Sequence, residues 1–306
     1  MRIVSMVPSA TEIVAALGLL DDLVGVTYEC DFPPEVRSKA IVVESTLPCG
    51  LAPAEIHRLI GEAYREGRNY FRIRTDLLIE LRPDLVITQG VCSVCAVAPG
   101  QADTALHLHP PFRILILQAE TVEGIWQDIR RVGAATGKTT EAETLVARLR
   151  ARLEALRAQI PPAPARPQVL LLDWLDPPMV AGHWAPEMVE WAGGTHVLND
   201  AGQPSRTISW ADVEAVDPDA VFFVPCGYRL AEVLEELKHL RPPAGWSRLR
   251  AVRRRAVWAA DANAYFSRPG PRFVHGIEVL IETLWGVRVF SDVSSQAAWA
   301  MAEAWL

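Results

Sequence analysis

The sequence of 306 residues contains no long apolar run and no start typical of an export signal. No stretch approaches the roughly 20 apolar residues that a membrane-spanning helix needs. Residues 2–7 already have the pattern of a β-strand, and they are not preceded by the charged and apolar regions of a secretory signal. As it stands, the sequence predicts a cytoplasmic protein that does not span the membrane. If a leader has been removed, we expect a periplasmic or cell-surface protein.

Positive charge is also scarce, with 30 Lys and Arg against 37 Asp and Glu and a net charge of −7. A nucleic-acid partner is not expected, because neutralising phosphates needs a basic face. The P-loop, Gly-x-Ser-x-Gly and His-Glu-x-x-His patterns are absent, and no Gly-x-Gly-x-x-Gly follows the first expected strand. The sequence therefore predicts a protein that is not an enzyme.

Short runs of Val, Ile and Leu alternate with helical patterns, which is typical of βαβ units and parallel sheets. A chain of this length exceeds the size at which one core usually stops growing, so we expect two lobes. The predicted fold class is α/β, with two Rossmann-like lobes that have central parallel sheets and are joined by one long backbone helix. We expect strands at residues 2–7, 23–27, 40–44, 85–89, 114–118, 169–174, 220–224 and 256–260.

The expected joining helix spans residues 139–160, where Leu145, Leu149, Leu153 and Leu156 recur at helical spacing. A proline-rich stretch, residues 161–167, ends it and forms a stiff spacer. The predicted domains are an N-terminal lobe (1–137), the linking helix and spacer (138–167) and a C-terminal lobe (168–306). A helix is expected to begin after Ser9 through a capping box.

A weak internal repeat relates the two halves. Residues 77–91 and residues 212–226 each combine an acidic and apolar helical pattern, a Pro-Asp pair and an apolar strand. The pairs are Pro83-Asp84 and Pro218-Asp219. The repeat indicates two lobes of one plan, although a common helix-to-strand turn would give the same pattern.

Four cysteines follow expected strands: Cys30, Cys92, Cys95 and Cys226. In open α/β sheets, ligands bind outside the carboxyl ends of the strands. Thiolates suit zinc and iron–sulfur clusters, so these four residues form a candidate metal site. Two alternatives remain open, namely small buried apolar side chains and disulfide or redox chemistry. Cys49, in a loop, is left out of the set.

Aromatic residues form a second candidate group, because several of them follow strands and could line a broad, partly apolar pocket. A place in the core is the alternative for each. Arg268, in a loop stiffened by prolines, could hold a carboxylate, amide or phosphate oxygen of a ligand, or pair with Asp261 or a helix end. The candidate ligand-binding aromatic residues are Tyr28, Trp174, Trp184, Trp210, Tyr265 and Phe266.

Several segments together resemble one known family. They are residues 2–12, 23–27 with 31–34, 81–87, 186–189 with 193–194, 209–213 and 267–272. The sequence resembles the solute-binding proteins of ABC transporters for cobalamin, haem and iron siderophores, the class in which one long helix bridges two lobes. The cobalamin-binding branch is the most similar.

The resemblance implies a non-enzymatic protein that holds cobalamin, a related corrinoid or another small metal-containing ligand in the cleft between its lobes. The loop of Pro8, Ser9 and Ala10 and the aromatic loops would contact this ligand. The family also implies an ABC permease as partner, docked through one acidic residue of each lobe, with Glu44 and Glu187 as candidates. The cysteines depart from the family pattern, so the alternative function is a cysteine-ligated metal or iron–sulfur carrier or sensor on the same scaffold.

Overall fold

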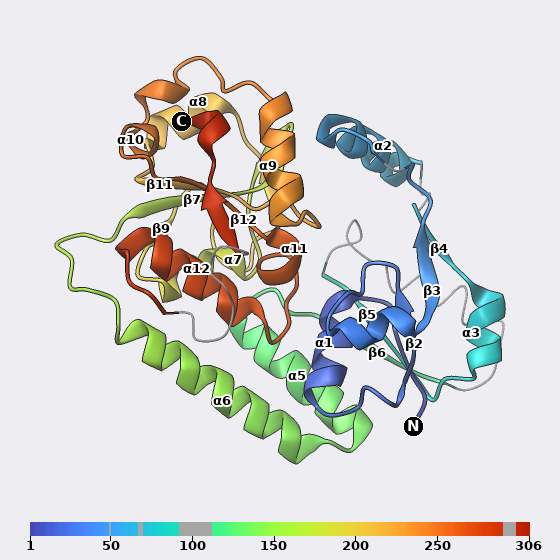
Figure 1. Cartoon of the computed structure of the whole chain (residues 1–306). Helices are drawn as coiled ribbons and strands as arrows, with labels where there is room; N and C mark the ends of the chain where they lie inside the picture. Colours follow the sequence, from blue (N-terminus) through green and yellow to red (C-terminus); the bar gives the residue numbers. More distant parts are fainter. Residues whose placement is uncertain (49, 67–69, 92–111, 290–297) are drawn as a thin grey trace. The chain divides into compact units, whose positions relative to one another are not determined.

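The computed structural model describes residues 1–48, 50–66, 70–91, 112–289 and 298–306. The chain forms two compact units, whose positions relative to each other are not determined (Figure 1). The first half of the long helix α6 (Thr139–Arg157) belongs to unit 1 and the second half to unit 2. Unit 1 comprises Met1–Leu51, Glu55–Ala119 and Glu123–Arg148, and unit 2 comprises Ala52–Ala54, Glu120–Val122 and Leu149–Leu306.

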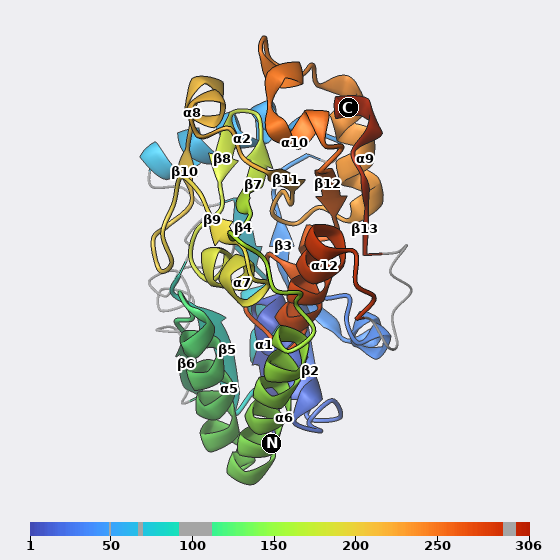
Figure 2. The same cartoon turned by 90° about the vertical axis from the view of Figure 1, so that its left-hand side faces the viewer.

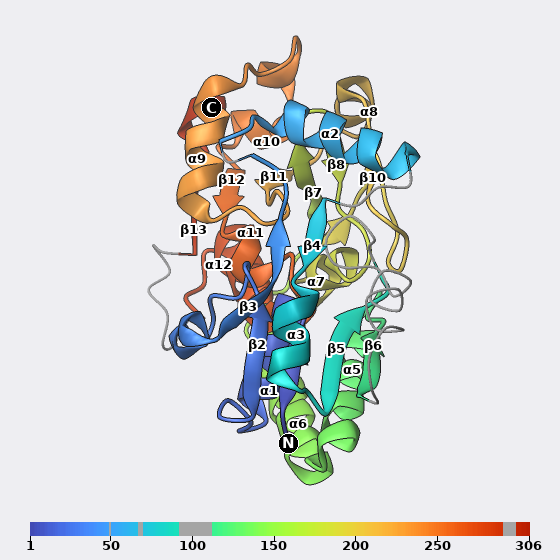
Figure 3. The same cartoon turned by 90° about the vertical axis from the view of Figure 1, so that its right-hand side faces the viewer.

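Unit 1 contains a six-stranded sheet with the order β4-β3-β2-β1-β5-β6. All neighbours are parallel except β3 and β4, so most strands end at one shared edge (Figure 3). Every strand expected in this half is present, and the short edge strand β4 was not predicted. The strands are β1 (Ile3–Ser5), β2 (Leu23–Thr27), β3 (Ala40–Ser45), β4 (Phe71–Ile73), β5 (Leu85–Gln89) and β6 (Arg113–Leu117).

Helices cover both faces of this sheet, with α1 (Pro8–Ala16) and α3 (Thr75–Leu81) on opposite sides (Figures 1 and 3). α3 approaches β2 closely at Gly25. A Cβ atom there would lie within 3.2 Å of the side chains of Val4, Val42 and Leu81, so glycine lets this helix pack directly on the sheet. The other helices of this part are η1 (Pro34–Ser38), α2 (Pro53–Arg65) and α5 (Val122–Thr136).

The predicted start of the first helix is wrong by about two residues. α1 begins at Pro8, after an N-cap, Val7, that has no side-chain cap bond. Proline suits the first helical position because it has no N–H to leave unpaired and its φ is already helical. Ser9 is consequently inside the helix and cannot be its cap; its hydroxyl is buried and makes no hydrogen bond within the described chain.

Unit 2 is built on a second sheet with the order β10-β8-β7-β11-β12-β13, and β9 pairs with β7 (Figure 2). β9, β7, β11 and β12 are parallel, whereas β8, β10 and β13 add antiparallel edges. The strands predicted at 169–174, 220–224 and 256–260 are confirmed. The strands are β7 (Gln168–Leu175), β8 (Pro178–Val180), β9 (Thr195–His196), β10 (Arg206–Thr207), β11 (Ala220–Phe223), β12 (Val257–Ala260) and β13 (Trp299–Met301).

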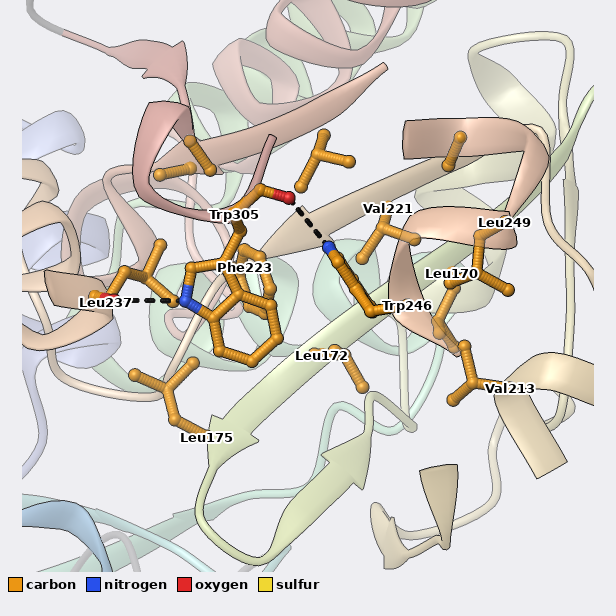
Figure 4. Packing of buried hydrophobic residues seen from close by; sticks show 14 of the residues in the cluster. Leu170, Leu172, Leu175, Val213, Val221, Phe223, Leu237, Trp246, Leu249 and Trp305 are labelled. Carbon is orange, nitrogen blue, oxygen red and sulfur yellow. Dashed lines mark hydrogen bonds between the residues drawn. The ribbon is translucent and has the colours of Figure 1, made fainter. Parts of the chain in front are cut away.

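One face of this sheet carries an aromatic core around Trp246 and Trp305 (Figure 4). Their ring centroids are 4.9 Å apart at 90°, and Phe223 of β11 lies 5.0 Å from Trp305. Helices α8, α9 and α10 contribute aliphatic side chains to the same cluster. The helices of unit 2 are α7 (Ala185–Trp191), α8 (Trp210–Val216), α9 (Leu230–His239), η2 (Trp246–Arg248), α10 (Arg250–Arg253), α11 (Ala262–Tyr265), α12 (Phe273–Trp285) and η4 (Glu303–Trp305).

The two Pro-Asp pairs make the same contact in their units. The Asp84 carboxylate accepts a hydrogen bond from the Arg2 backbone N–H at 2.6 Å, just before β1. The Asp219 carboxylate accepts one from the Gln168 N–H at 2.9 Å, at the start of β7. Each aspartate thus ties the strand that it precedes to the first strand of its unit, and both preceding helices end in a left-handed residue, Arg82 and Asp217.

Candidate functional site

The carboxyl edge of the unit 2 sheet brings three loops together. β7, β11 and β12 are parallel neighbours and therefore end at the same edge. The Cys226 N–H donates to the Asp173 carbonyl at 2.9 Å, and the Asn263 N–H donates to the Tyr228 carbonyl at 2.9 Å. The loops after β7, β11 and β12 thus form one continuous polar edge, which is where α/β sheets bind ligands.

Trp174 and Tyr228 supply aromatic surface at this edge. Both side chains are partly exposed, and their rings meet edge to face at 5.9 Å. The Trp174 indole N–H donates to the Asp176 carbonyl at 3.2 Å, which fixes the ring. Burial raises the pKa of Tyr228 to about 12, with smaller contributions from Glu236 and Glu232. A tyrosine hydroxyl is neutral at physiological pH even at its ordinary pKa, so this group can donate to a ligand.

The other predicted aromatic residues of unit 2 are more enclosed. Trp184, Tyr265 and Phe266 are buried, and the Trp184 indole donates to the Phe266 carbonyl at 2.9 Å. Trp210 is half-buried and packs at 5.6 Å on Trp246 of the aromatic core. Contact of these four residues with a ligand stays a prediction.

Arg268 is buried in the loop after β12, with only 4% of its surface exposed. Its guanidinium donates to the Asn263 side-chain carbonyl at 2.8 Å. Asp261, the alternative partner considered from the sequence, caps the short helix α11 by accepting from the Ala264 N–H at 2.8 Å. A buried guanidinium presents its donors in a rigid fork. The role of Arg268 toward a ligand stays a prediction.

In unit 1, the start of α1 and the loop after β2 are joined by a chain of small polar side chains. The Thr11 hydroxyl donates to Ser5 Oγ at 2.8 Å and lies 3.0 Å from the Cys30 thiol. Pro8, Ser9 and Ala10 are buried beside them. This arrangement positions the first helical turn at the carboxyl edge, and its role toward a ligand stays a prediction.

Exposed aromatic side chains lie at the same edge of unit 1. Tyr28 and Phe32, after β2, are 42% and 41% exposed. The Tyr28 ring lies 6.4 Å from Phe71, which packs at 4.1 Å on Tyr70. Phe71 is buried in the core of unit 1 and Tyr70 packs against that core. Sequence reasoning did not select Phe32, because nothing in the local pattern distinguishes an exposed aromatic side chain from a core one.

The four predicted metal-binding cysteines cannot be assessed as a set. Cys92 and Cys95 lie outside the described residues, whereas Cys30 is buried in unit 1 and Cys226 is partly exposed in unit 2. The described ranges contain no group of three or more His, Cys, Asp and Glu side chains that could hold a metal ion. The cysteine site therefore stays a prediction, and no observation supports zinc or an iron–sulfur cluster.

The two acidic candidates for permease docking both make contacts inside their own units. Glu44 forms an ion pair with Arg72 at 2.5 Å. Glu187 accepts a hydrogen bond from the Val122 N–H at 2.5 Å, in the first turn of α5. Their role in docking stays a prediction.

Asp173 is the most perturbed acid of the unit 2 edge. Burial raises the pKa of Asp173 to about 7, although the hydrogen bond donated by Ser205 acts in the opposite direction. The residue lies near the end of β7 and was not predicted as a site residue, because an isolated acid within an apolar run carries no motif.

Asp173→Asn is expected to stabilise the protein more at pH 8 than at pH 5. A folded-state pKa above the ordinary value of 3.8 means that the folded protein binds this proton more tightly than the unfolded chain does. The carboxyl group therefore costs stability progressively as the pH rises from about 4 to about 7. Melting temperatures of the wild type and the variant at both pH values test this; an equal difference at pH 5 and pH 8 would contradict it.

No helix of the described residues combines the length and apolar character needed to cross a bilayer.

Comparison with known proteins shows similarity along nearly the whole chain. The family model described as "Periplasmic binding protein" matches residues 3–264. An ABC transporter substrate-binding lipoprotein, YvrC of Bacillus subtilis, is 26% identical over 93% of this chain and 80% of its own length. The Vitamin B12-binding protein of Vibrio cholerae is 25% identical over 90% and 86% of the two chains.

Solved structures support the same fold. A periplasmic heme-binding protein from Pseudomonas aeruginosa superimposes with a TM-score of 0.72 at 20% identity, covering 97% of this chain and 96% of its own. This likeness in fold extends over a chain that contains two units with parallel-rich sheets. The chain therefore belongs to the periplasmic binding protein family, and it is a solute-binding protein and not an enzyme.

Proposed function

We propose that this chain binds a corrinoid of the cobalamin type and presents it to an ABC permease. The observation that carries the proposal is the similarity along 90% of the chain to a Vitamin B12-binding protein. Similarity to a heme-binding protein rests on the fold alone, at 20% identity. A corrinoid is also the choice that fits the aromatic and polar groups at the two sheet edges.

Unit 1 offers apolar surface for a flat macrocycle. Two bulky aromatic side chains are exposed within five residues, Tyr28 and Phe32, and together they offer apolar surface at this edge. Aromatic faces gain binding energy by covering a conjugated ring while they lose little side-chain entropy. These residues are proposed to cover one side of the ligand.

Unit 2 offers donors and acceptors for the periphery of the ligand. The Tyr228 hydroxyl is neutral at physiological pH, as any tyrosine hydroxyl is, and can donate a hydrogen bond. Trp174 adds a half-buried indole ring beside it. A few placed polar groups on an apolar wall are the usual composition of a small-molecule site.

The experiment is a titration of the full chain with cyanocobalamin, followed by the corrin absorption bands and by melting temperature, with haemin and a ferric hydroxamate siderophore in parallel. We expect saturable binding of one cyanocobalamin per chain and a rise in melting temperature by mass action. Binding of haemin or the siderophore without any response to cyanocobalamin would overturn the corrinoid assignment.

Tyr28→Ala is expected to weaken cyanocobalamin binding about tenfold, which is roughly 1.4 kcal/mol. The loss reflects one aromatic face removed from the ligand. Ile79→Ala is the matched control, because Ile79 is equally exposed, at 42%, but lies on α3. Equal affinities for the two variants would show that Tyr28 does not contact the corrinoid.

A further inference from the structure

Asp173 occupies a position where the fold does not require an acid. It follows four fully buried apolar residues of β7, residues 169–172, and precedes the buried Leu175 by two positions. Its carbonyl accepts the Cys226 N–H at 2.9 Å, which places it level with the loop after β11. The carboxyl group therefore lies at the ligand-binding edge of the sheet.

Only one oxygen of this carboxyl group is satisfied. Oδ2 accepts a hydrogen bond from the Ser205 hydroxyl, whereas Oδ1 is enclosed and has no hydrogen-bond partner among the residues that the structure describes. No cation of this part of the chain forms an ion pair with Asp173 either. Leaving a buried polar atom unsatisfied costs stability. A purely structural hydrogen bond with Ser205 therefore explains one oxygen of the carboxyl group but not the other.

A second polar atom without a partner lies on the adjoining turn. Ser205 Oγ also accepts the Gly182 N–H at 3.1 Å, and the next residue, His183, has an enclosed Nδ1 that makes no hydrogen bond to the described chain. Asp173 Oδ1 and His183 Nδ1 are thus two of the four such side-chain atoms found in the described residues, and Ser205 bonds both Asp173 and the neighbour of His183. Gly182 permits the approach, because a Cβ there would lie 2.2 Å from the Gln203 carbonyl oxygen.

We propose that Asp173, Ser205 and His183 form a subsite that reads the side arms of the ligand, accepting an amide and rejecting a carboxylate. The proposal rests on the proposed function and names the chemistry that selects the ligand. The Ser205 hydroxyl already donates to the Asp173 carboxyl group, so a ligand donor would approach from the same side. Ser205 lies in a surface loop in which Ala201, Gln203 and Pro204 are exposed, so a small movement of this loop admits an arm of the ligand.

The selection follows from charge and hydrogen-bond capacity. A primary amide can donate an N–H to Asp173 Oδ1 and leaves no buried charge uncompensated. A ligand carboxylate would bring a second negative charge against a carboxyl group that has no cation beside it, which is strongly unfavourable at low dielectric. Corrinoids of the cobalamin type carry amide arms and haem carries carboxylate arms, so the subsite favours the corrinoid.

The test compares two cobalt corrins that differ only in their arms, dicyanocobinamide with amides and dicyanocobyrinic acid with carboxylates. For the wild type at pH 8, we expect dicyanocobinamide to bind at least about tenfold more tightly. In Asp173→Asn the ratio should fall below about threefold, because the asparagine amide can donate to a carboxylate. If the asparagine variant does not fold, Asp173→Ser replaces it. The serine hydroxyl can also donate to a carboxylate, so the affinity ratio should fall in the same way.

The matched control is Asp200→Asn, which removes an exposed carboxylate from the loop that carries Ser205 and should leave the ratio unchanged. If the wild type binds both corrins and Asp173→Asn keeps the wild-type ratio, the subsite is wrong while the proposed function stands. If the wild type binds neither corrin, the proposed function fails and the subsite fails with it.

Discussion

Trp305→Ala is expected to lower the free energy of unfolding of unit 2 by about 3–5 kcal/mol, the usual cost of removing a large buried aromatic side chain. Trp305 is only 3% exposed although it is the penultimate residue. Its ring packs against Trp246 and Phe223, and the contact with Trp246 is edge to face (Figure 4). The variant would therefore open a cavity in the centre of the aromatic core.

Trp305 takes part in two buried hydrogen bonds, and the loss of one of them adds to this cost. The Trp305 indole donates to the Leu237 carbonyl of α9 at 3.0 Å, and the Trp305 carbonyl accepts from the Trp246 indole at 2.7 Å. Alanine keeps the second bond but leaves the Leu237 carbonyl without its indole donor. A buried acceptor that loses its partner costs about 1–3 kcal/mol within the total.

Urea unfolding followed by tryptophan fluorescence and circular dichroism measures the effect. Glu303→Ala is the matched control, two residues away, because Glu303 is 68% exposed and pairs only at the surface with Arg255. We expect the Glu303→Ala control to lose less than about 1 kcal/mol in free energy of unfolding. A Trp305→Ala variant as stable as Glu303→Ala would mean that the chain end does not complete the core.

Arg152→Met is expected to destabilise unit 2 by about 3 kcal/mol, because it leaves a buried carboxylate short of its main cation. Glu278 of α12 has a side chain only 3% exposed, and it lies 2.6 Å from the Arg152 guanidinium of α6. His275 remains 2.7 Å from the other carboxylate oxygen. This contact keeps the loss of stability at the lower end of the roughly 3–5 kcal/mol that is usual for a broken buried ion pair. Arg152 also donates to the Val289 carbonyl at 2.6 Å.

The double variant Arg152→Met with Glu278→Met is the sharper comparison. Removing both charges avoids the uncompensated carboxylate, so the double variant should be more stable than Arg152→Met alone. Thermal and urea unfolding of the wild type, the two single variants and the double variant give the coupling free energy between Arg152 and Glu278. Strictly additive losses would show that this ion pair does not hold α6 against α12.

The parallel strands of both units were predictable from the sequence because each is a short apolar run that ends at a clear turn. The Pro-Asp pairs were informative for the same reason, since Asp84 and Asp219 make equivalent contacts. Elements outside the repeating pattern were missed. β8 and β10 are two or three residues long, and no local periodicity indicates that β8 pairs with β7 and β10 pairs with β8.

The candidate site was predictable in place but not in detail. The carboxyl edges of the sheets followed from the order of strands and loops, and Trp174 lies there. Trp210 shows the limit, because its ring packs on Trp246 and also on Trp305, which lies nearly a hundred residues away in the sequence. Asp173 could not be found at all, because its importance comes from an unsatisfied oxygen that only the three-dimensional structure reveals.

Native mass spectrometry with elemental analysis tests the central claim most directly. Full-length protein purified without oxygen would be measured alone and after addition of cyanocobalamin. We predict one corrinoid per chain after the addition, and no stoichiometric iron or zinc before it. Protein that retains a metal or cluster on its thiols and takes up no corrinoid would contradict the account.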